Sequence, residues 1–334
     1  MAVKFTKPEI NVREKLAELD KPSGIAGEAM LRAETVAEQQ ALIGVGRRNM
    51  IINGDFQVWQ RGTSFSSGFT ADRWYTAAGT VTKDGLAIKH VATNTDPYLL
   101  YKVEDLGNKF DGQDAVASFY LKTSSGINKL QYLTVCNVNY THDVMYELPS
   151  EIEGYTRWAC PVKLTNAHTD YIRIVVELEA VSGNTSYLRQ FQLELGKAAT
   201  PFEHRSYGEE LALCERYYQK SYDKDAYITG STSLSGVGAV DHYGTSDATN
   251  VLAQVYFRTQ MRDAPTVTTF DHNTSNGGNA HSGRAYIVSN SGAASYNTTT
   301  NNIGSTGFRS YVPKNGAGWA AHRLIFQWQA VAEL

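Results

Sequence analysis

Apolar and polar residues alternate with a period of two in several runs between residues 48 and 205. Successive side chains of a β-strand point to opposite faces, so each run predicts a strand with one buried face. Three such faces are Leu130, Tyr132, Thr134, Cys136 and Val138; Trp158, Cys160, Val162 and Leu164; and Ile172, Ile174, Val176 and Leu178. Turn-forming residues at 124–126, 153–154 and 182–184 separate the runs. Many short strands in succession predict a mainly β fold, with a jelly-roll β-sandwich over residues 48–206.

Residues 222–334 predict a second, smaller β-sandwich. Strand-like runs occur at 251–257, 265–270, 285–288 and 323–331, and the last places Leu324, Phe326, Trp328 and Ala330 on one face. The polar stretches 273–279 and 295–302 are predicted to be turns or loops. Between the two sandwiches, in a linking segment over 207–221, residues 209–220 predict a helix whose buried side comprises Leu211, Cys214 and Tyr218.

The amino-terminal segment, residues 1–47, changes to a helical period. Short helices are predicted around residues 9–19, after Ser23, and after Thr35, where Thr35 and Glu38 match a capping box. Helices this short are marginal in water without a partner, and the segment is too small for a core of its own. We therefore expect its apolar positions to contact another protein chain: Val12, Leu16, Leu19, Ala29, Ala33, Val36 and Ile43.

Composition narrows the functional classes. The net charge of the 334-residue chain is −3, which gives no general attraction to nucleic acid or to an anionic membrane. The three cysteines, Cys136, Cys160 and Cys214, have no metal-site or disulfide-framework spacing, so we expect reduced, mostly buried thiols. Residues 1–9 lack the apolar core of a signal peptide, and no run has the roughly 20 apolar residues of a membrane span, which indicates assembly in the cytoplasm and no membrane insertion.

Motifs for catalysis are sparse in the sequence. The glycines at Gly44 and Gly46 follow a predicted helix, whereas a dinucleotide fingerprint follows a strand, so they are read as a helix stop and linker. No phosphate-binding loop, nucleophile elbow or zinc-protease motif is present, and no two of the eight histidines have the spacing of a metal pair. Carboxylates distant in sequence could still hydrolyse a glycosidic bond. The chain lacks the fixed-period repeat of a β-helix, however, and we expect no enzyme.

Residues 48–65, which include INGDFQVW at 52–59, resemble the opening of a β-sandwich module of bacteriophage tail fibres and other virion appendages. The apolar run 50–59, interrupted by a turn signal at 53–55, is predicted to be the first strand of that module. The resemblance continues at 70–74, at 191–203 as the closing strand, and at 208–219; shorter matches lie at 26–46, 257–267 and 326–334. It implies a jelly roll similar to galactose-binding-like and carbohydrate-binding modules.

The resemblance also directs attention to particular side chains. Related modules hold calcium between their first and last strands, which makes Asp55 and Glu194 candidate ligands. Two carboxylates make an incomplete shell, which favours the alternative that Asp55 turns the chain and Glu194 is an exposed strand residue. Candidate glycan contacts are aromatics in or near turn-rich sequence: Tyr98, Tyr140, Tyr243, Tyr296, Tyr311 and Trp319.

Asp72, Arg73 and Trp74 resemble a ligand triad, with an aromatic platform beside polar groups. The alternative is structural: Trp59, Trp74 and Trp158 lie in strand-like alternation, where tryptophan is more often core. We favour the core interpretation, with Arg73 bonded to Asp72 or to a loop carbonyl.

Two functions fit these observations. In the first, the chain is a phage tail fibre protein that is anchored to another virion protein by its amino-terminal segment and binds a host surface glycan. The resemblance to virion appendages implies that it acts as a trimer. The distal sandwich would face the receptor. In the second, it is a capsid decoration, spike or collar protein with an architectural role and no essential glycan ligand. Either way its expected location is the virion, after assembly in the host cytoplasm. No cofactor is expected apart from the candidate calcium.

Overall fold

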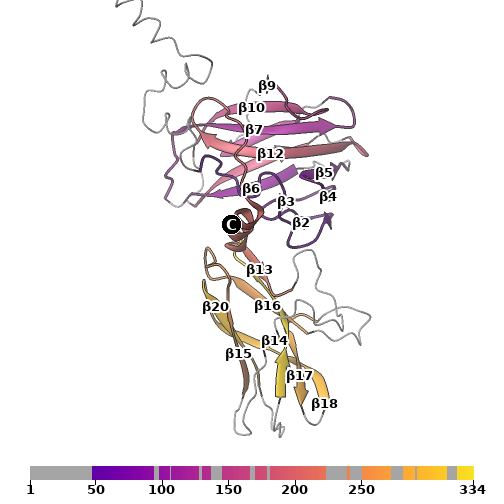
Figure 1. The fold of residues 1–334 in the computed structure, drawn as a ribbon, viewed down its shortest axis with the longest axis vertical. Helices are drawn as coiled ribbons and strands as arrows, with labels where there is room; N and C mark the ends of the chain where they lie inside the picture. Colours follow the sequence, from indigo (N-terminus) through magenta and orange to yellow (C-terminus); the bar gives the residue numbers. More distant parts are fainter. Residues whose placement is uncertain are drawn as a thin grey trace, which may run out of the picture.

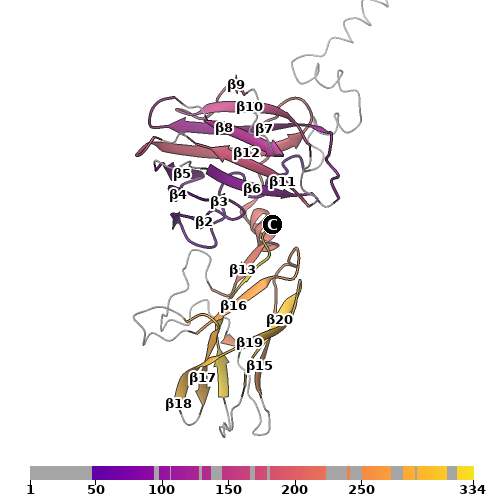
Figure 2. The same ribbon diagram turned by 180° about the vertical axis from the view of Figure 1, so that it is seen from behind.

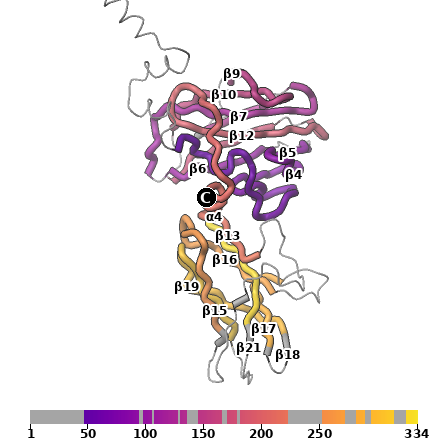
Figure 3. The backbone as a smooth tube through the Cα atoms, in the orientation of Figure 1, coloured from indigo at the N-terminus to yellow at the C-terminus, as the bar shows by residue number. Residues whose placement is uncertain are grey.

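The chain forms two β-modules that lie end to end (Figures 1 and 2). The computed structural model describes residues 47–93, 98–105, 107–127, 130–136, 145–165, 170–178, 181–222, 239–240, 250–271, 281–289, 292–313 and 322–334. We call the part before residue 207 the first module and the part after residue 215 the second module. The short helix α4 (Tyr207–Glu215) lies between them (Figure 3).

Two antiparallel sheets form the first module. The seven-stranded sheet has the order β1 (Ser64–Phe65), β4 (Thr80–Asp84), β5 (Ala87–Val91), β12 (Thr185–Leu195), β7 (Asp114–Thr123), β10 (Thr156–Lys163) and β9 (Tyr146–Leu148). The five-stranded sheet has the order β2 (Gly68–Phe69), β3 (Tyr75–Thr76), β6 (Tyr98–Glu104), β11 (Tyr171–Glu177) and β8 (Tyr132–Cys136). One apolar core contains side chains from both sheets, which makes the module a β-sandwich.

Period-two alternation gives the correct buried face for β10 and β11 but not for β8. On β11, Ile172, Ile174 and Val176 are fully buried, as predicted. On β8 the prediction is wrong, because Leu133 and Val135 are buried while Tyr132 and Thr134 are partly exposed. Both faces of β8 carry β-prone residues, so alternation alone could not determine which face points to the core.

The predicted first strand at residues 50–59 is also wrong, since the first strand of the described chain is β1. Residues 52–55 form a turn, and Asn53 and Phe56 have left-handed backbone angles of 58° and 57°. Such angles interrupt a strand. Ile51, Phe56, Val58 and Trp59 are nevertheless buried, so the hydrophobic run reflects burial rather than extension.

The predicted helix at 209–220 is shorter than expected. Helix α4 begins after Ser206, whose hydroxyl accepts a hydrogen bond from the amide of Glu209, and ends at Glu215. Residues 218–220 form strand β13 (Tyr218–Lys220) of the second module. Cys214 is buried on the helix as predicted, whereas Tyr218 is buried in the strand and Leu211 is only partly buried.

Three small sheets surround the core of the second module. The first sheet has the order β13, β22 (Gln327–Val331) and β16 (Thr266–Phe270). The second sheet has the order β14 (Ala239–Val240), β21 (His322–Ile325), β17 (Arg284–Ser289) and β18 (Gly292–Asn297). The third sheet has the order β15 (Asn250–Tyr256), β20 (Gly307–Pro313) and β19 (Thr299–Gly304). The four predicted strand runs are confirmed, although the last is divided between β21 and β22 at Phe326. The predicted loop at 295–302 is wrong, because β18 and β19 occupy most of it. Its polar residues alternate between exposed and partly buried positions, with Asn297, Thr299 and Asn301 exposed.

Several predictions fall outside the described residues. They are the amino-terminal helices with all seven of their proposed contact residues, and the polar stretch 273–279. In the part of the chain that is described, no helix has the length and apolarity needed to cross a membrane.

Candidate functional site

Two segments of the first module that resemble virion appendages, residues 53–58 and 72–74, meet around the buried side chain of Asn53. The side-chain amide of Asn53 donates to the carbonyls of Val58 (2.8 Å) and Asp72 (3.1 Å), and its Oδ1 accepts from the amide of Val58 (2.9 Å). The indole Nε1 of Trp74 donates to the Asn53 carbonyl (3.1 Å). One fully buried side chain therefore holds residues 53–58 against residues 72–74.

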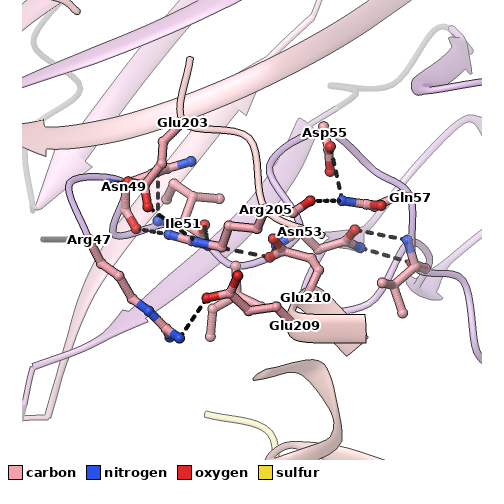
Figure 4. A network of polar contacts seen from close by, with 12 residues as sticks. Arg47, Asn49, Ile51, Asn53, Asp55, Gln57, Glu203, Arg205, Glu209 and Glu210 are labelled. Atoms are coloured by element: carbon pink, nitrogen blue, oxygen red, sulfur yellow. Dashed lines mark hydrogen bonds and ion pairs between the residues drawn. The ribbon is translucent and has the colours of Figure 1, made fainter. Parts of the chain in front are cut away.

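The closing strand predicted over 191–203 ends at residue 195 in the structure, as the end of β12. Strand β12, Glu203 beyond its end, and helix α4 bind the segment that contains Asn53 (Figure 4). The amide of Phe191 donates to the Gly54 carbonyl (2.7 Å), and the amides of Arg48 and Asn49 donate to Glu203 Oε2 (2.7 and 2.6 Å). The amide of Asn53 donates to Glu210 on α4. We call residues 48–60, 70–74, 191–205 and 210 the motif clasp. Its contacts give the sequence blocks that resemble virion appendages a structural role: they close the sandwich.

The positions of the tryptophans support a structural role for the motif clasp. Trp59 and Trp74 are buried in the core, and Trp74 packs against Phe56, Tyr101 and Phe191 with ring centroids 4.9–5.3 Å apart. Trp158 is partly buried and packs against the same core. Neither Trp59 nor Trp74 is available as a sugar platform.

The candidate calcium ligands have separate hydrogen-bonding roles. Glu194 is buried, so the prediction that it is an exposed strand residue is wrong. Its carboxylate accepts hydrogen bonds from Thr200 and Gln192. Asp55 accepts from Gln57 (3.0 Å), and burial raises its pKa. Among the described residues, no group of three or more histidine, cysteine, aspartate or glutamate side chains could hold a metal ion. Calcium at Asp55 and Glu194 stays a prediction.

Arg73 links the two modules. Its guanidinium donates to Glu333 and to the carbonyl of Lys102 (2.6 Å), and it lies 3.5 Å from the ring centroid of Tyr217. Arg61 donates to the other oxygen of Glu333 (2.9 Å). Arg73 was expected to bond to Asp72 or a loop carbonyl; its carboxylate partner is instead Glu333, and its carbonyl partner belongs to strand β6. We call this set of contacts the junction cluster.

Asp72 lies under the junction cluster and accepts hydrogen bonds from the side chain (2.7 Å) and the amide of Gln60. Burial raises its pKa from 3.8 to about 6, although Arg61 and Gln60 act in the opposite direction. Because the folded state then holds the proton more tightly than the unfolded chain, this stability is present below about pH 4 and lost as pH rises through about 6.

The variant Asp72→Asn removes this titration. Relative to the variant, we expect the free energy of unfolding of the wild-type chain to fall by about 2–3 kcal/mol between about pH 4 and pH 7. Urea unfolding of both chains across this pH range measures the difference. A difference that stays constant with pH would contradict the role given to Asp72.

A pocket of about 240 Å³ opens beside the junction cluster, on the side of the five-stranded sheet that faces away from the core. It is lined by Phe69, Arg73, Tyr75, Leu100, Lys102 and Leu334. The rings of Phe69 and Tyr75 meet edge to face, with centroids 5.5 Å apart. The guanidinium of Arg73 is committed to the junction cluster, and the ammonium of Lys102 donates one hydrogen bond to the carbonyl of Leu334 (2.8 Å). An ammonium has three N–H groups, so two aromatic walls beside Lys102 combine apolar contact with hydrogen-bond donors, which is typical of a small-ligand site.

Two pocket residues lie on the outer face of the five-stranded sheet, Leu100 and Lys102. On β6 the side chains of Tyr98, Leu100 and Lys102 share that face, while Leu99, Tyr101 and Val103 are buried. Tyr98 aligns with Glu177 on β11, which aligns with Tyr132 on β8. Tyr98 is therefore the predicted glycan contact that lies on the same surface as the pocket.

The other predicted glycan contacts are dispersed. Tyr296 on β18 is partly buried and packs against the core of the second module, and Tyr311 on β20 is partly exposed. Tyr140, Tyr243 and Trp319 lie outside the described residues. The sequence reasoning missed Phe69, Tyr75 and Lys102. Tyr98 and Lys102 are four residues apart in one strand-like run, so both side chains point to the same face. This spacing could have placed Lys102 on the surface of Tyr98.

Of the cysteines, Cys160 and Cys214 are buried, as expected. Burial raises the pKa of the Cys214 thiol well above its usual value. A buried, protonated thiol is unreactive, which gives Cys214 a packing role.

No family model matches the chain, and no curated protein matches it. Solved structures with some similarity include the tandem CBM22-1–CBM22-2 domains of Xyn10C from Paenibacillus barcinonensis (12% identity, 82% of this chain and 95% of that one, TM-score 0.27). Others are a putative sugar binding protein from Bacteroides thetaiotaomicron (12%, 45% and 100%, 0.22) and the botulinum neurotoxin serotype D binding domain (11%, 81% and 82%, 0.22). Similarities this distant carry no argument about function.

Proposed function

We propose that the chain is a fibre protein of a bacteriophage virion that binds a host cell-surface glycan through its β-modules. The sequence blocks that resemble virion appendage proteins support the class of protein. The pocket at Phe69, Tyr75 and Lys102 is the observation that carries the binding proposal. Under this proposal the first module is a jelly roll of the carbohydrate-binding type.

The chemistry of the pocket suits a sugar ring. The rings of Phe69 and Tyr75 offer faces or edges to the apolar C–H groups of a pyranose. Lys102 supplies an ammonium group that donates to hydroxyl or carboxylate oxygens, and Arg173 and Arg73 lie near enough to lower its pKa further after the larger effect of burial. Binding without a chemical step requires no nucleophile or general base, and we propose no enzymatic reaction.

The arrangement of the modules supports a fibre. The modules lie end to end (Figure 1). The junction cluster joins them through buried ion pairs. A rigid junction keeps the second module away from the particle if the amino-terminal segment holds the other end. We propose that this segment binds another virion protein and that three copies form the fibre.

The variant Tyr75→Ala removes one aromatic wall of the pocket. We expect it to weaken glycan binding at least about tenfold, equivalent to about 1.4 kcal/mol. The full-length chain, coupled to beads so that many weak sites act together, is compared with the variant on an array of bacterial surface glycans. Tyr146→Ala is the matched control, because Tyr146 is an exposed tyrosine on β9 of the other sheet.

Equal binding by Tyr75→Ala and the wild-type chain would exclude the pocket as the glycan site. Gold-labelled antibodies against the chain test its place on the particle independently. A tail-tip position supports adhesion, whereas a position on the capsid lattice would overturn the fibre proposal in favour of a decoration role.

A further inference from the structure

The second module has a surface of its own, on the sheet β15-β20-β19 at one side of the module (Figures 1 and 2). Alternate residues of β15 and β20 are buried in the core: Ala253, Val255, Phe308, Ser310 and Val312. The residues between them point outward. We call this outward side the distal face; its side chains include Leu252, Gln254, Tyr256, Arg309, Tyr311 and Asn301.

Strand register places the distal-face residues in rows. Gln254, Arg309 and Asn301 align across the three strands. Tyr311 lies two residues from Arg309 on one side of this polar row, and Tyr256 aligns two residues away on the other side. With a rise of about 3.4 Å per residue, the two tyrosines are separated by about 14 Å along the strands, with the polar row between them.

Tyr256 is the most exposed of the large hydrophobic residues that the structure describes, with 77% of its surface accessible. Its neighbour on β20 is Gly307. A Cβ at Gly307 would overlap the carbonyl oxygen of Val255, so the close approach of the strands requires glycine there. Glycine has no side chain to cover the tyrosine, which leaves the ring accessible to a ligand.

The charge of the distal face has one sign. Strands β15, β19 and β20 contain no aspartate or glutamate, and Arg309 is their only charged residue. Arg309 is exposed and forms no ion pair with any residue that the structure describes. A guanidinium is geometrically suited to bind a carboxylate with two parallel hydrogen bonds.

We propose that the distal face binds an acidic oligosaccharide, with Arg309 on a sugar carboxylate and Tyr256 and Tyr311 stacked on neighbouring rings. Gln254 and Asn301 lie in the same row as Arg309 and reach sugar hydroxyls. The inference rests on the proposed function for the class of ligand, but it concerns a separate site and a specific chemistry. One cation is too few for a nucleic-acid backbone, and the polar row leaves no apolar centre for a protein interface.

The test uses the full-length chain with oligogalacturonate as the acidic probe and a neutral galactan oligosaccharide for comparison. We expect Tyr256→Ala to weaken oligogalacturonate binding at least about tenfold, and Arg309→Gln to abolish the preference for the acidic probe. Arg309→Lys, which keeps the charge, should retain part of that preference, and added salt should weaken acidic binding in the wild-type chain. Tyr146→Ala is the control, and unchanged thermal melting shows that each variant is folded.

The inference is overturned if Tyr256→Ala and Arg309→Gln bind oligogalacturonate as tightly as the wild-type chain does. It is also overturned if the wild-type chain does not bind this probe. The proposed function fails separately. If Tyr75→Ala loses glycan binding while both distal-face variants keep it, the pocket proposal stands and the distal-face proposal is wrong. If the folded wild-type chain binds no glycan at all, both are wrong.

Discussion

Replacing Gly54 by alanine is expected to destabilise the first module by about 3 kcal/mol or more. A Cβ at this position would overlap the backbone carbonyl oxygen of Phe191. Backbone cannot rotate away as a flexible side chain does, so β12 must shift and break the hydrogen bond between Phe191 and Gly54. Urea unfolding followed by tryptophan fluorescence measures the loss, because Trp59 and Trp74 lie in this core.

Gly208→Ala is the matched control for this variant. Gly208 lies in the first turn of α4, and a Cβ there meets no atom within 4 Å. Alanine favours helix over glycine by up to about 1 kcal/mol, so this variant should be neutral or slightly more stable. Equal stability of Gly54→Ala and Gly208→Ala would contradict the closing role of the motif clasp.

Arg73→Met is expected to destabilise the folded chain by about 3–5 kcal/mol and to uncouple its two modules. The variant leaves the buried carboxylate of Glu333 with Arg61 as its remaining partner in the junction cluster. It also removes the guanidinium that lies against Tyr217 and donates to the Lys102 carbonyl. In scanning calorimetry we expect the transitions of the two modules to separate, whereas they overlap in the wild-type chain.

Arg47→Met is the control for an ion pair without burial. Arg47 pairs with Glu209 at 2.7 Å, but their side chains are 57% and 40% exposed. Pairs of this kind contribute about 1 kcal/mol or less. If both arginine variants melt like the wild-type chain, the junction cluster does not couple the modules.

The buried face of a strand could be predicted from the sequence where burial alone determined the alternation of apolar and polar residues. Ile172, Ile174 and Val176 on β11 alternate because one side of the strand is core and the other is not. Residues 50–59 misled the prediction because two causes overlap: the residues are apolar since they are buried, but Asn53 binds the chain into turns rather than a strand. Local pattern cannot reveal such a tertiary asparagine network.

The candidate site was harder to predict because its residues come from distant parts of the chain. Tyr75 aligns with Leu100 on β6, and this pairing becomes visible only when the strand order is known. The carboxylate that holds Arg73 belongs to Glu333, 260 residues further along. Tyr256 was missed for a different reason: it continues an apolar run, and only the exposure beside Gly307 distinguishes it from a core residue.

Competition of phage adsorption tests the central claim, glycan-dependent attachment by this chain, most directly. Host cells are incubated with the purified full-length chain, and the adsorption rate of particles that carry it is then measured. We predict that the wild-type chain lowers the rate in a dose-dependent manner, and that a folded Tyr75→Ala, Tyr256→Ala double variant lowers it at least about tenfold less effectively. Unchanged adsorption at saturating concentrations of the folded wild-type chain, or equal competition by the double variant, would contradict the account.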